Sequence, residues 1–445
     1  MTQVFSQMAL GLSVYKLGYH RAAWRMPDFP QNAMMSLDAF TDAARAAEDA
    51  KFDFVFFADI SAVENLENPA RDISLEHYVV KLDPIVALSA ISAVTSHIGL
   101  IGTVSTTYTP PYRIARQIAS LDVISHGRAG WNVVTSYSPY ERQNFGVEDI
   151  SNIDARYARA HEAIDVVQGL WNSWDPDAFV ADKTSGQYFD REKLSILGHE
   201  GDYFSVKGPL DVAPSPQGMP VMVSAGDSPW AREMAAKYAN IQYAPTQGDL
   251  AKAQEYYRDI KSKAAGHGRD PRDLRILPGF MPIIGETDVE AAAKHRALKD
   301  LIHPKTGFGL LMPLFGDLSK HNLDTTLPRS LEPDPDHMRG FAKSFFDRAM
   351  AENWTIRQCY EHLADGEPWF MTMVGSAKSI TDTLEEWFHG EAADGFNLLP
   401  DHMPGGFTDF VSLVLPDLRR RGLFRTEYSG TTLRERLRPN AKTLQ

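Results

Sequence analysis

The sequence has a single cysteine, Cys359, among 445 residues. One cysteine cannot form an intrachain disulfide or supply several thiolate ligands, which excludes disulfide scaffolds and iron–sulfur proteins. So low a cysteine content is typical of a reducing compartment, and we expect the protein in the cytoplasm. The fourteen histidines include no H-E-x-x-H pair and no tight cluster, so we expect no structural metal.

Long hydrophobic runs and an excess of positive charge are also missing. No window of about 20 apolar residues occurs, and no basic stretch followed by an apolar run opens the chain, so we expect neither a membrane span nor an export signal. The formal net charge of -13 gives no general attraction to phosphate backbones or anionic membranes. We therefore expect neither nucleic acid nor a membrane as a partner.

Several standard catalytic and nucleotide-binding motifs are absent. There is no G-x-G-x-x-G between a strand and a helix near the start, and no G-x-x-x-x-G-K-[ST] phosphate loop. No G-x-S-x-G elbow is present, and the spacing of the carboxylates selects no acid–base pair, so neither a serine hydrolase nor a glycosidase is supported. A metal-dependent barrel hydrolase is the alternative from another enzyme class.

What the sequence does contain is a repeated alternation of strand and helix. The apolar run FDFVFFAD predicts a strand that is covered on both faces, as in a parallel sheet. Asp83 followed by Pro84 predicts the start of a helix that runs to about His97. We expect eight strands, over residues 7–15, 52–59, 98–106, 128–135, 220–224, 241–243, 276–284 and 395–399. This alternation indicates either a (β/α)8 barrel or a doubly wound sheet.

Helical periodicity and two interruptions complete the expected organisation, a single domain over 1–445. Ser36 is expected to cap a helix whose apolar residues recur at helical spacing on one face. The stretch 175–212 interrupts the alternation of strand and helix, which predicts an insertion with a small hairpin around Gly198–Gly201. The stretch 303–368 is too long and proline-rich for a simple connection, which predicts a mobile insertion or lid.

Polar side chains stand at the ends of consecutive predicted strands. Asp59 and Thr103 end two of them, and Asn132 lies in the next. In a barrel these side chains would reach the carboxyl-end face, where barrel enzymes place their chemistry. Uncharged donors and acceptors such as Thr and Asn suit the polar edge of a flavin ring. The alternative is that Asp59 caps a loop and that Asn132 pairs with buried backbone.

The segment SAGDSPW is the nearest substitute for a phosphate-binding loop. A strand is predicted to end at Gly226, and a helix begins after Asp227 and Ser228. Backbone N–H groups and a capping hydroxyl at a helix N-terminus form an anion site that suits a flavin phosphate. Ser-Pro is equally an ordinary way to begin a helix.

A family resemblance rests on several ordered motifs. The run SHGRAGWNVVTS, residues 125–136, closely resembles the signature of the nitrilotriacetate monooxygenase component A and dibenzothiophene-sulfone monooxygenase group, within the bacterial-luciferase-like flavin enzymes. Further matches, covering essentially the whole chain, are NFG, DARY, LWNSW, GPLDV, SPQG, ADGFNLLP and RRGLFRTEYSGTTLRERL. The resemblance implies a luciferase-like TIM (β/α)8 barrel with insertions.

The same resemblance implies a reaction and its partners. It implies the oxygenase component of a two-component monooxygenase, which receives reduced FMN (FMNH2) from a separate NAD(P)H:flavin reductase. The resemblance further implies that O2 adds to the flavin and that the resulting peroxyflavin oxidises a small organic substrate. A homodimer or homotetramer is expected. The alternatives are a deazaflavin-dependent oxidoreductase of the same superfamily and a non-catalytic flavin-binding subunit.

Site residues follow from the matching motifs. The resemblance implies FMN contacts from Asp59, Thr103, Tyr157 and Ser228, and it places Asn132 beside the ring, where we expect it to take part in catalysis. Gly226 and Asp227 belong to the same cofactor-binding turn as Ser228.

Two further positions, His20 and Ile153, bear on the predicted substrate and flavin sites. His20, in HRAAWR, resembles the H-x-G-x-W-R region at the pocket mouth, so we expect it to line the substrate side and assign it a catalytic role. The alternative is that His20 only braces the first loop. Ile153 stands where several relatives have a histidine of the flavin site. The substrate itself, whether chelate, sulfone, alkane or heteroaromatic, is not specified by the sequence.

Overall fold

A computed structural model describes residues 5–66, 71–147, 152–245 and 248–438, and these form a closed parallel barrel. The barrel strands, in order around the ring, are β1 (Ala9–Ser13), β2 (Phe54–Phe57), β3 (Gly99–Ser105), β4 (Ala129–Val134), β7 (Val221–Ala225), β8 (Ile241–Ala244), β9 (Arg275–Gly285) and β11 (Gly395–Leu398). The ring closes because β9 pairs with both β8 and β11. The predicted barrel is therefore confirmed, and the doubly wound sheet is excluded.

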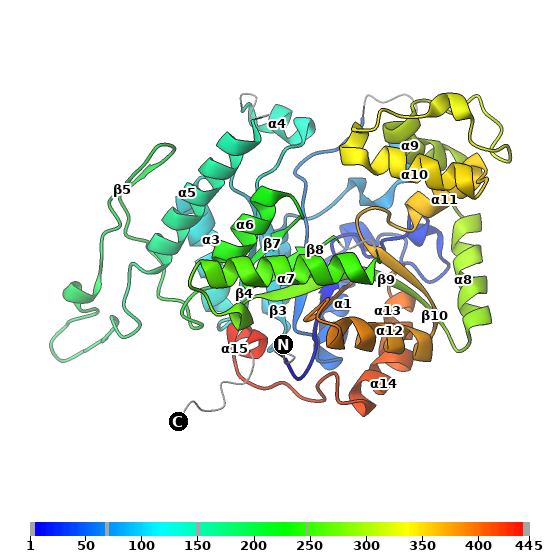
Figure 1. Ribbon diagram of the computed structural model, residues 1–445. Helices are drawn as coiled ribbons and strands as arrows, with labels where there is room; N and C mark the ends of the chain where they lie inside the picture. The colour runs from blue at the N-terminus through cyan, green and yellow to red at the C-terminus, as the bar shows by residue number, and fades with distance from the viewer. Residues whose placement is uncertain (1–4, 67–70, 148–151, 246–247, 439–445) are drawn as a thin grey trace.

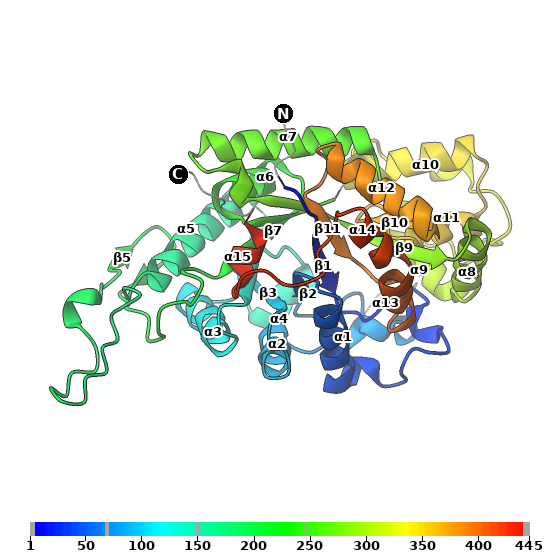
Figure 2. The same cartoon turned by 90° about the horizontal axis from the view of Figure 1, so that it is seen from below.

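Helices surround the ring, as the view from below shows (Figure 2). They are α1 (Leu37–Asp49), α2 (Pro84–Ser92), α3 (Pro111–Ile124), α4 (Pro139–Phe145), α5 (Ile153–Trp171), α6 (Pro229–Tyr238), α7 (Leu250–Gly266), α8 (Asp288–Asp300) and α12 (Ala377–His389). The closing helix consists of α13 (Gly405–Asp409), a π-helical turn (Phe410–Val414) and α14 (Leu415–Arg420), and α15 (Leu433–Leu437) follows. None of the helices in the described part of the chain is long and apolar enough to cross a membrane.

All eight predicted strands are present, and they are the eight strands of the ring. The prediction missed a ninth strand, β10 (Met371–Ser376), which pairs with Phe280–Gly285 of β9 outside the ring. In β10 the burial alternates, with Val374 exposed, so its sequence lacks the continuous apolar run that marks a strand covered on both faces.

The helix starts were predicted with mixed success. The Asp83 side chain accepts hydrogen bonds from the N–H groups of Ile85 and Val86, so the predicted cap of α2 is confirmed. This helix ends at Ser92, five residues before the predicted end. Ser36 stands at the N-cap position of α1, but its side chain makes no capping hydrogen bond, so that part of the prediction is wrong.

The segment 175–212 forms an arm that projects away from the barrel (Figure 1). It contains the predicted hairpin, made of β5 (His199–Glu200) and β6 (Ser205–Val206). Glu162 of α5 holds the hairpin, because its carboxylate accepts hydrogen bonds from the N–H groups of Tyr203 and Phe204 and lies 3.0 Å from His199 Nε2.

The segment 303–368 is a helical unit above one side of the barrel (Figure 1). It contains α9 (Pro304–Phe315), α10 (Phe341–Ala351) and α11 (Ile356–Ala364). These helices bury a hydrophobic cluster of their own, which includes Leu311, Phe345 and Trp354. The segment is thus packed rather than structureless, and its role as a lid stays a prediction, as do the domain limits.

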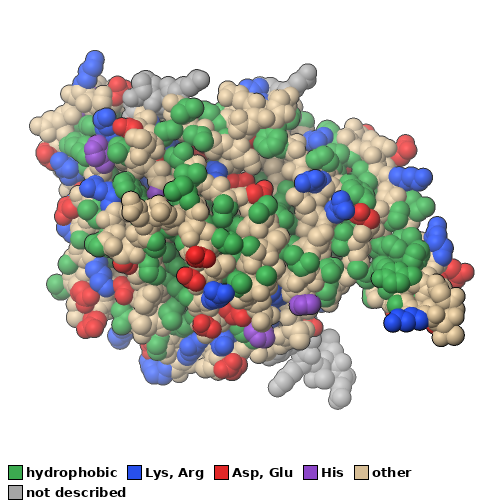
Figure 3. Space-filling view, turned by 180° about the vertical axis from the view of Figure 1, so that it is seen from behind, with side chains coloured by type: hydrophobic (Ala, Val, Ile, Leu, Met, Phe, Trp, Pro, Cys, Tyr) green, Lys and Arg blue, Asp and Glu red, His purple; other side chains and the backbone are tan. Residues whose placement is uncertain are grey.

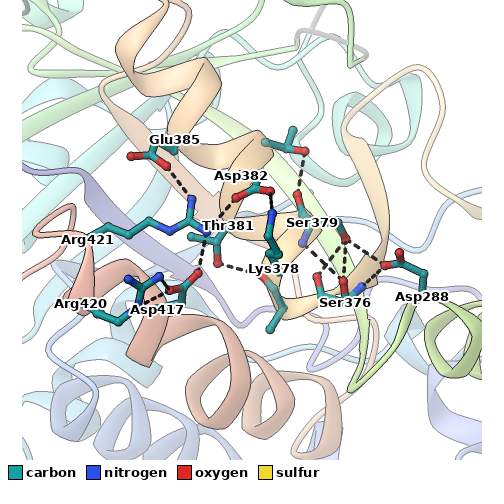
Figure 4. A network of polar contacts seen from close by, with 12 residues as sticks. Asp288, Ser376, Lys378, Ser379, Thr381, Asp382, Glu385, Asp417, Arg420 and Arg421 are labelled. Carbon is teal, nitrogen blue, oxygen red and sulfur yellow. Dashed lines mark hydrogen bonds and ion pairs between the residues drawn. The ribbon is translucent and has the colours of Figure 1, made fainter.

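An ion-pair network ties the closing helix to α12 (Figure 4). Arg421 lies 2.7 Å from Asp382 and 2.5 Å from Glu385 of α12, and it also pairs with Asp417. Nearby, the backbone N–H of Ser376, at the start of α12, donates to the carboxylate of Asp288 at 2.7 Å. The C-terminal helices are in this way fixed to the outside of the ring.

Arg128, in the run that carries the family resemblance, is a structural residue. Its side chain is 2% exposed and makes five hydrogen bonds, to Ser92, Thr95, Ile98 and Ser125, mainly at carbonyl oxygens. Burial lowers its pKa to about 10, so the guanidinium stays charged at neutral pH. It satisfies carbonyls that follow α2 and α3, where a positive charge also complements the helix dipole.

Replacing this guanidinium should strongly destabilise the fold. Arg128→Met leaves several buried carbonyls without donors, and we expect a loss of about 3 kcal/mol or more in the free energy of unfolding. Urea denaturation followed by circular dichroism measures it. Arg116→Met, at an exposed position of α3, is the control and should change stability by less than about 0.5 kcal/mol. Equal effects of the two substitutions would contradict this role for Arg128.

Candidate active site

The inside of the barrel changes from apolar to polar along the strands. Towards the amino ends the inward positions carry Ala9, Ile101, Val221 and Ile241, which belong to one buried hydrophobic cluster. Two residues after Ile101 and Ile241 come Thr103 and Tyr243, and the neighbouring strands carry Ser13, Asn132 and Asn397 towards the same end. A polar layer at the carboxyl ends is where barrel enzymes place their sites.

Thr103 and Asn132 are brought together in this layer, as predicted from their strand positions. The Asn132 Nδ2 donates to Thr103 Oγ1 at 2.9 Å, and Thr103 Oγ1 donates to the Phe57 carbonyl at 2.7 Å. Asn132 is 3% exposed, and its Oδ1 has no hydrogen-bond partner among the described residues. A buried acceptor without a donor costs about 1–3 kcal/mol, which indicates that a ligand donor completes it.

Asp59 follows β2 at the same end of the barrel. Its Oδ2 accepts from Ser61 Oγ at 2.9 Å, and Glu141 of α4 accepts from the Ser61 backbone N–H at 3.0 Å. Burial raises the pKa of both carboxyl groups. Asp59 does brace its own loop through Ser61, as the alternative interpretation expected, and it also remains half-buried beside the polar layer.

The turn with Gly226, Asp227 and Ser228 leads from β7 into α6. Gly226 has a φ of +110°, a conformation that favours glycine, and its carbonyl accepts from Gln242 Nε2 and Tyr256 Oη. The Ser228 side chain caps α6 by accepting from the Ala231 N–H at 3.2 Å. The helix N-terminus is therefore built as predicted from Ser228 and Pro229.

The N-terminus of α5 meets that of α6. Trp230 Nε1 of α6 donates to Asp154 of α5 at 2.7 Å, and the rings of Tyr157 and Trp230 stack with centroids 6.4 Å apart. Beside Tyr157, the Nε of Arg156 is buried without a partner among the described residues. Two positive helix ends, a buried guanidinium N–H and a tyrosine favour a bound anion such as phosphate.

These features fit a flavin mononucleotide. The unpaired Asn132 Oδ1 offers an acceptor to the ring, and the ends of α5 and α6 offer donors to the phosphate. Ile153, the first residue of α5, contributes no polar group there. Within the described ranges no group of three or more His, Cys, Asp or Glu side chains could hold a metal ion. The roles of the individual residues stay predictions.

His20 lies in the loop that follows β1, whereas Thr103 and Asn132 belong to β3 and β4. It is fully buried, its Nδ1 accepts from the Ala22 N–H, and its Nε2 has no partner among the described residues. Burial lowers the pKa of His20 to about 3, and its charged neighbours are Asp365, Arg21 and groups of α8. His20 is therefore neutral near pH 7, and any part that it plays is that of a neutral imidazole.

The sequence interpretation missed three inward-facing polar residues of the same layer. Ser13 ends β1 and hydrogen-bonds to the Tyr19 hydroxyl, Tyr243 lies in β8, and Asn397 in β11 has an unpaired buried Oδ1. The alternation of two residues along each strand could have found them, because Ser13 and Asn397 follow the inward positions Ala9, Gly11 and Gly395.

Comparisons with known proteins agree with this geometry. The family described as "Luciferase-like monooxygenase" matches residues 18–386. N-acetyl-S-(2-succino)cysteine monooxygenase of Bacillus subtilis (strain 168) is 43% identical over 437 residues, covering 98% of this chain and 97% of that protein. Nitrilotriacetate monooxygenase component A of Aminobacter aminovorans is 40% identical over 438 residues, covering 97% and 96%.

A solved structure extends the likeness from sequence to fold. Riboflavin lyase (RcaE), determined with modified FMN and riboflavin, superimposes with a TM-score of 0.82 at 31% identity and covers 97% of this chain and 95% of that one. The family match spans most of the chain, and the relatives align along nearly their full length. The chain therefore belongs to the luciferase-like monooxygenase family of enzymes, as its motifs predicted.

Proposed function

We propose that this protein is the oxygenase component of a two-component monooxygenase, which uses FMNH2 and O2 to oxidise a small organic substrate. The observation that carries the proposal is the buried, unpaired Asn132 Oδ1 in the polar layer, in a chain that is 40% identical to a protein named as a monooxygenase component A. The structure of a riboflavin lyase with the same fold contains modified FMN, which supports FMN as the cofactor of this protein.

Each predicted residue has a distinct task in the proposal. Thr103 orients the Asn132 amide so that its Oδ1 accepts from the flavin ring, and Asp59 borders the ring from the end of β2. Tyr157, Gly226 and Ser228 bind the phosphate, and Asp227 contributes its backbone N–H because its carboxylate would repel an anion. His20 lines the substrate side as a neutral imidazole.

When bound, FMNH2 would supply the two electrons with which one atom of O2 enters the substrate and the other leaves as water. The chain's own contribution is to hold the ring in the barrel mouth, to keep water away and to orient the substrate. An NAD(P)H:flavin reductase is the proposed partner, because no dinucleotide-binding motif occurs in the sequence. The proposed location is the cytoplasm.

Flavin reoxidation tests the proposal directly. Anaerobic protein loaded with photoreduced FMN is mixed with oxygenated buffer in a stopped-flow instrument, and FMN absorbance is compared with that of free FMNH2. We expect bound FMNH2 to reoxidise more slowly than free FMNH2. Identical rates would contradict the proposal, and tighter binding of a deazaflavin than of FMN would favour the deazaflavin-dependent alternative. If a metal chelator abolished the enzymatic activity, the result would favour the alternative of a metal-dependent barrel hydrolase.

Substitution of Asn132 separates a binding role from a structural one. Asn132→Leu removes an unpaired buried oxygen, so we expect unchanged or slightly higher thermal stability. FMN affinity should fall about tenfold or more, because the ring loses an acceptor. Fluorescence quenching of FMN and thermal unfolding measure the two effects. A loss of stability with no loss of FMN affinity would show that Asn132 only braces the barrel.

The phosphate site can be tested with two matched helix caps. Ser228 and Ser376 both cap a helix that follows a strand, and each side chain accepts from the N–H three residues later. Ser228→Ala and Ser376→Ala should each cost about 1 kcal/mol of stability. Only Ser228→Ala should weaken FMN binding, and it should leave riboflavin binding unchanged. The same FMN affinity in both variants would contradict a phosphate site at α6.

We also propose a homodimer or homotetramer, formed through the arm 175–212. Hydrophobic side chains gather on this arm (Figure 3), where Phe179 is 38%, Tyr188 is 68% and Ile196 is 51% exposed. Tyr188→Glu should lower the mass measured by light scattering after gel filtration, because a charge is costly in an apolar interface. Val289→Glu, on α8, is the exposed control. A monomeric wild type would contradict this proposal.

A further inference from the structure

Four cationic side chains gather where two strand-to-helix loops meet. Lys16 and Arg21 follow β1, and Arg71 and Lys81 lie between β2 and α2. We refer to these four residues as the basic cluster. Both loops leave the carboxyl ends of their strands, so the cluster stands at the same end of the barrel as the polar layer.

The basic cluster has more positive charge than its own carboxylate can neutralise. Arg71 pairs in a bidentate manner with Glu76, at 2.7 and 2.6 Å. Although burial alone would raise the pKa of Glu76, hydrogen bonds from Arg71 and Tyr78 hold it below its usual value. Among the described residues, Lys16, Arg21 and Lys81 form no ion pair, and Lys81 donates only to the Ala62 carbonyl.

Tyrosine side chains hold three of these cations, Lys16, Arg21 and Arg71, in place. The Tyr78 hydroxyl accepts from both Arg21 and Arg71, and the Tyr78 ring lies 4.6 Å from Lys16 Nζ. The rings of Tyr15 and Tyr19 lie 5.1 and 5.5 Å from the same Nζ. Burial and the neighbouring Arg21 lower the pKa of Lys16 to about 7, so a nearby anion would restore its full charge.

The basic cluster adjoins the polar layer. Tyr19, which packs against Lys16, hydrogen-bonds to Ser13 at the end of β1. Burial raises the pKa of Asp59, and the positive charge of Lys81 nearby partly opposes that rise. The nearby carboxylates bond elsewhere, because Glu64 accepts from Ser138, and Glu141 accepts from Ser61. An anion held by the cluster would therefore lie beside the ring-binding residues.

We propose that the basic cluster binds the carboxylate groups of an organic substrate that carries at least two of them. The inference rests on the proposed function, because it places the substrate next to the flavin. Three cations without carboxylate partners, two of them held by tyrosines, match a compact polyanion in a chain of net charge -13. The guanidinium of Arg21 suits bidentate contact with a carboxylate, and the two lysines supply point charges.

The flavin phosphate is the other anion that the basic cluster could hold. The ends of α5 and α6 already provide phosphate donors, and they follow β4 and β7, whereas the basic cluster follows β1 and β2. The two groups of donors therefore stand at different sectors of the ring. We assign the phosphate to the helix ends and the carboxylates to the basic cluster.

Calorimetric titration of the FMN-saturated protein tests this assignment. The probes are succinate, iminodiacetate and tricarballylate, with trimethyl tricarballylate as the neutral counterpart. We expect at least one carboxylate to bind and the ester not to bind. Arg21→Gln and Lys81→Gln should each weaken binding of that carboxylate about tenfold or more. Arg116→Gln, which removes an exposed arginine of α3, should leave it unchanged.

FMN affinity, measured on the same variants, separates this proposal from the proposed function. Arg21→Gln should retain wild-type affinity for FMN and for riboflavin. If Arg21→Gln weakens FMN but not riboflavin binding, the cluster is a phosphate site and the proposal is overturned. It is equally overturned if no probe binds the wild type, or if the ester binds as well as the carboxylate. If FMN affinity is unchanged in any of these cases, only the proposal for the basic cluster fails, and the proposed flavin site is unaffected.

Discussion

Closure of the ring through β9 is the constraint on which the rest of the structure depends. All eleven residues of β9 are buried, and the strand pairs in turn with β8, β11 and β10. A closed parallel ring has no free edge, and it fixes the carboxyl end of every strand relative to its neighbours. Thr103 and Asn132, 29 residues apart in the sequence, meet within hydrogen-bond distance because β3 and β4 are held in register.

The polar layer lowers the stability of the protein when no ligand is bound. Buried oxygens of Asn132 and Asn397 lack partners among the described residues, and inward-facing apolar residues would pack there without that cost. Such a layer is retained where a ligand supplies the missing donors, and its unfavourable free energy then becomes part of the binding free energy. The rigid apolar half of the barrel below, with Ile101, Val221 and Ile241, stabilises the structure that bears this cost.

Most of the fold could be predicted from the sequence, because buried parallel strands leave continuous apolar runs. The strand at β10 could not, since its half-exposed alternation is indistinguishable from that of a loop without knowledge of β9. In the site, Thr103 and Asn132 were predicted from strand ends and family motifs. The pairing of Tyr157 with Trp230 and the grouping of Lys16 with Arg21 and Arg71 depend on contacts between distant segments, which no local pattern encodes.

The separation of the two proposed anion-binding regions around the ring has a consequence for evolution and engineering. The helix ends after β4 and β7 and the loops after β1 and β2 share no residue, and the ring holds both in place. Loops in one sector can therefore change length and charge while the other sector keeps its geometry. Grafting the loops after β1 and β2 between relatives is accordingly a route to new selectivity that leaves the loops after β4 and β7, the proposed flavin-phosphate side, unchanged.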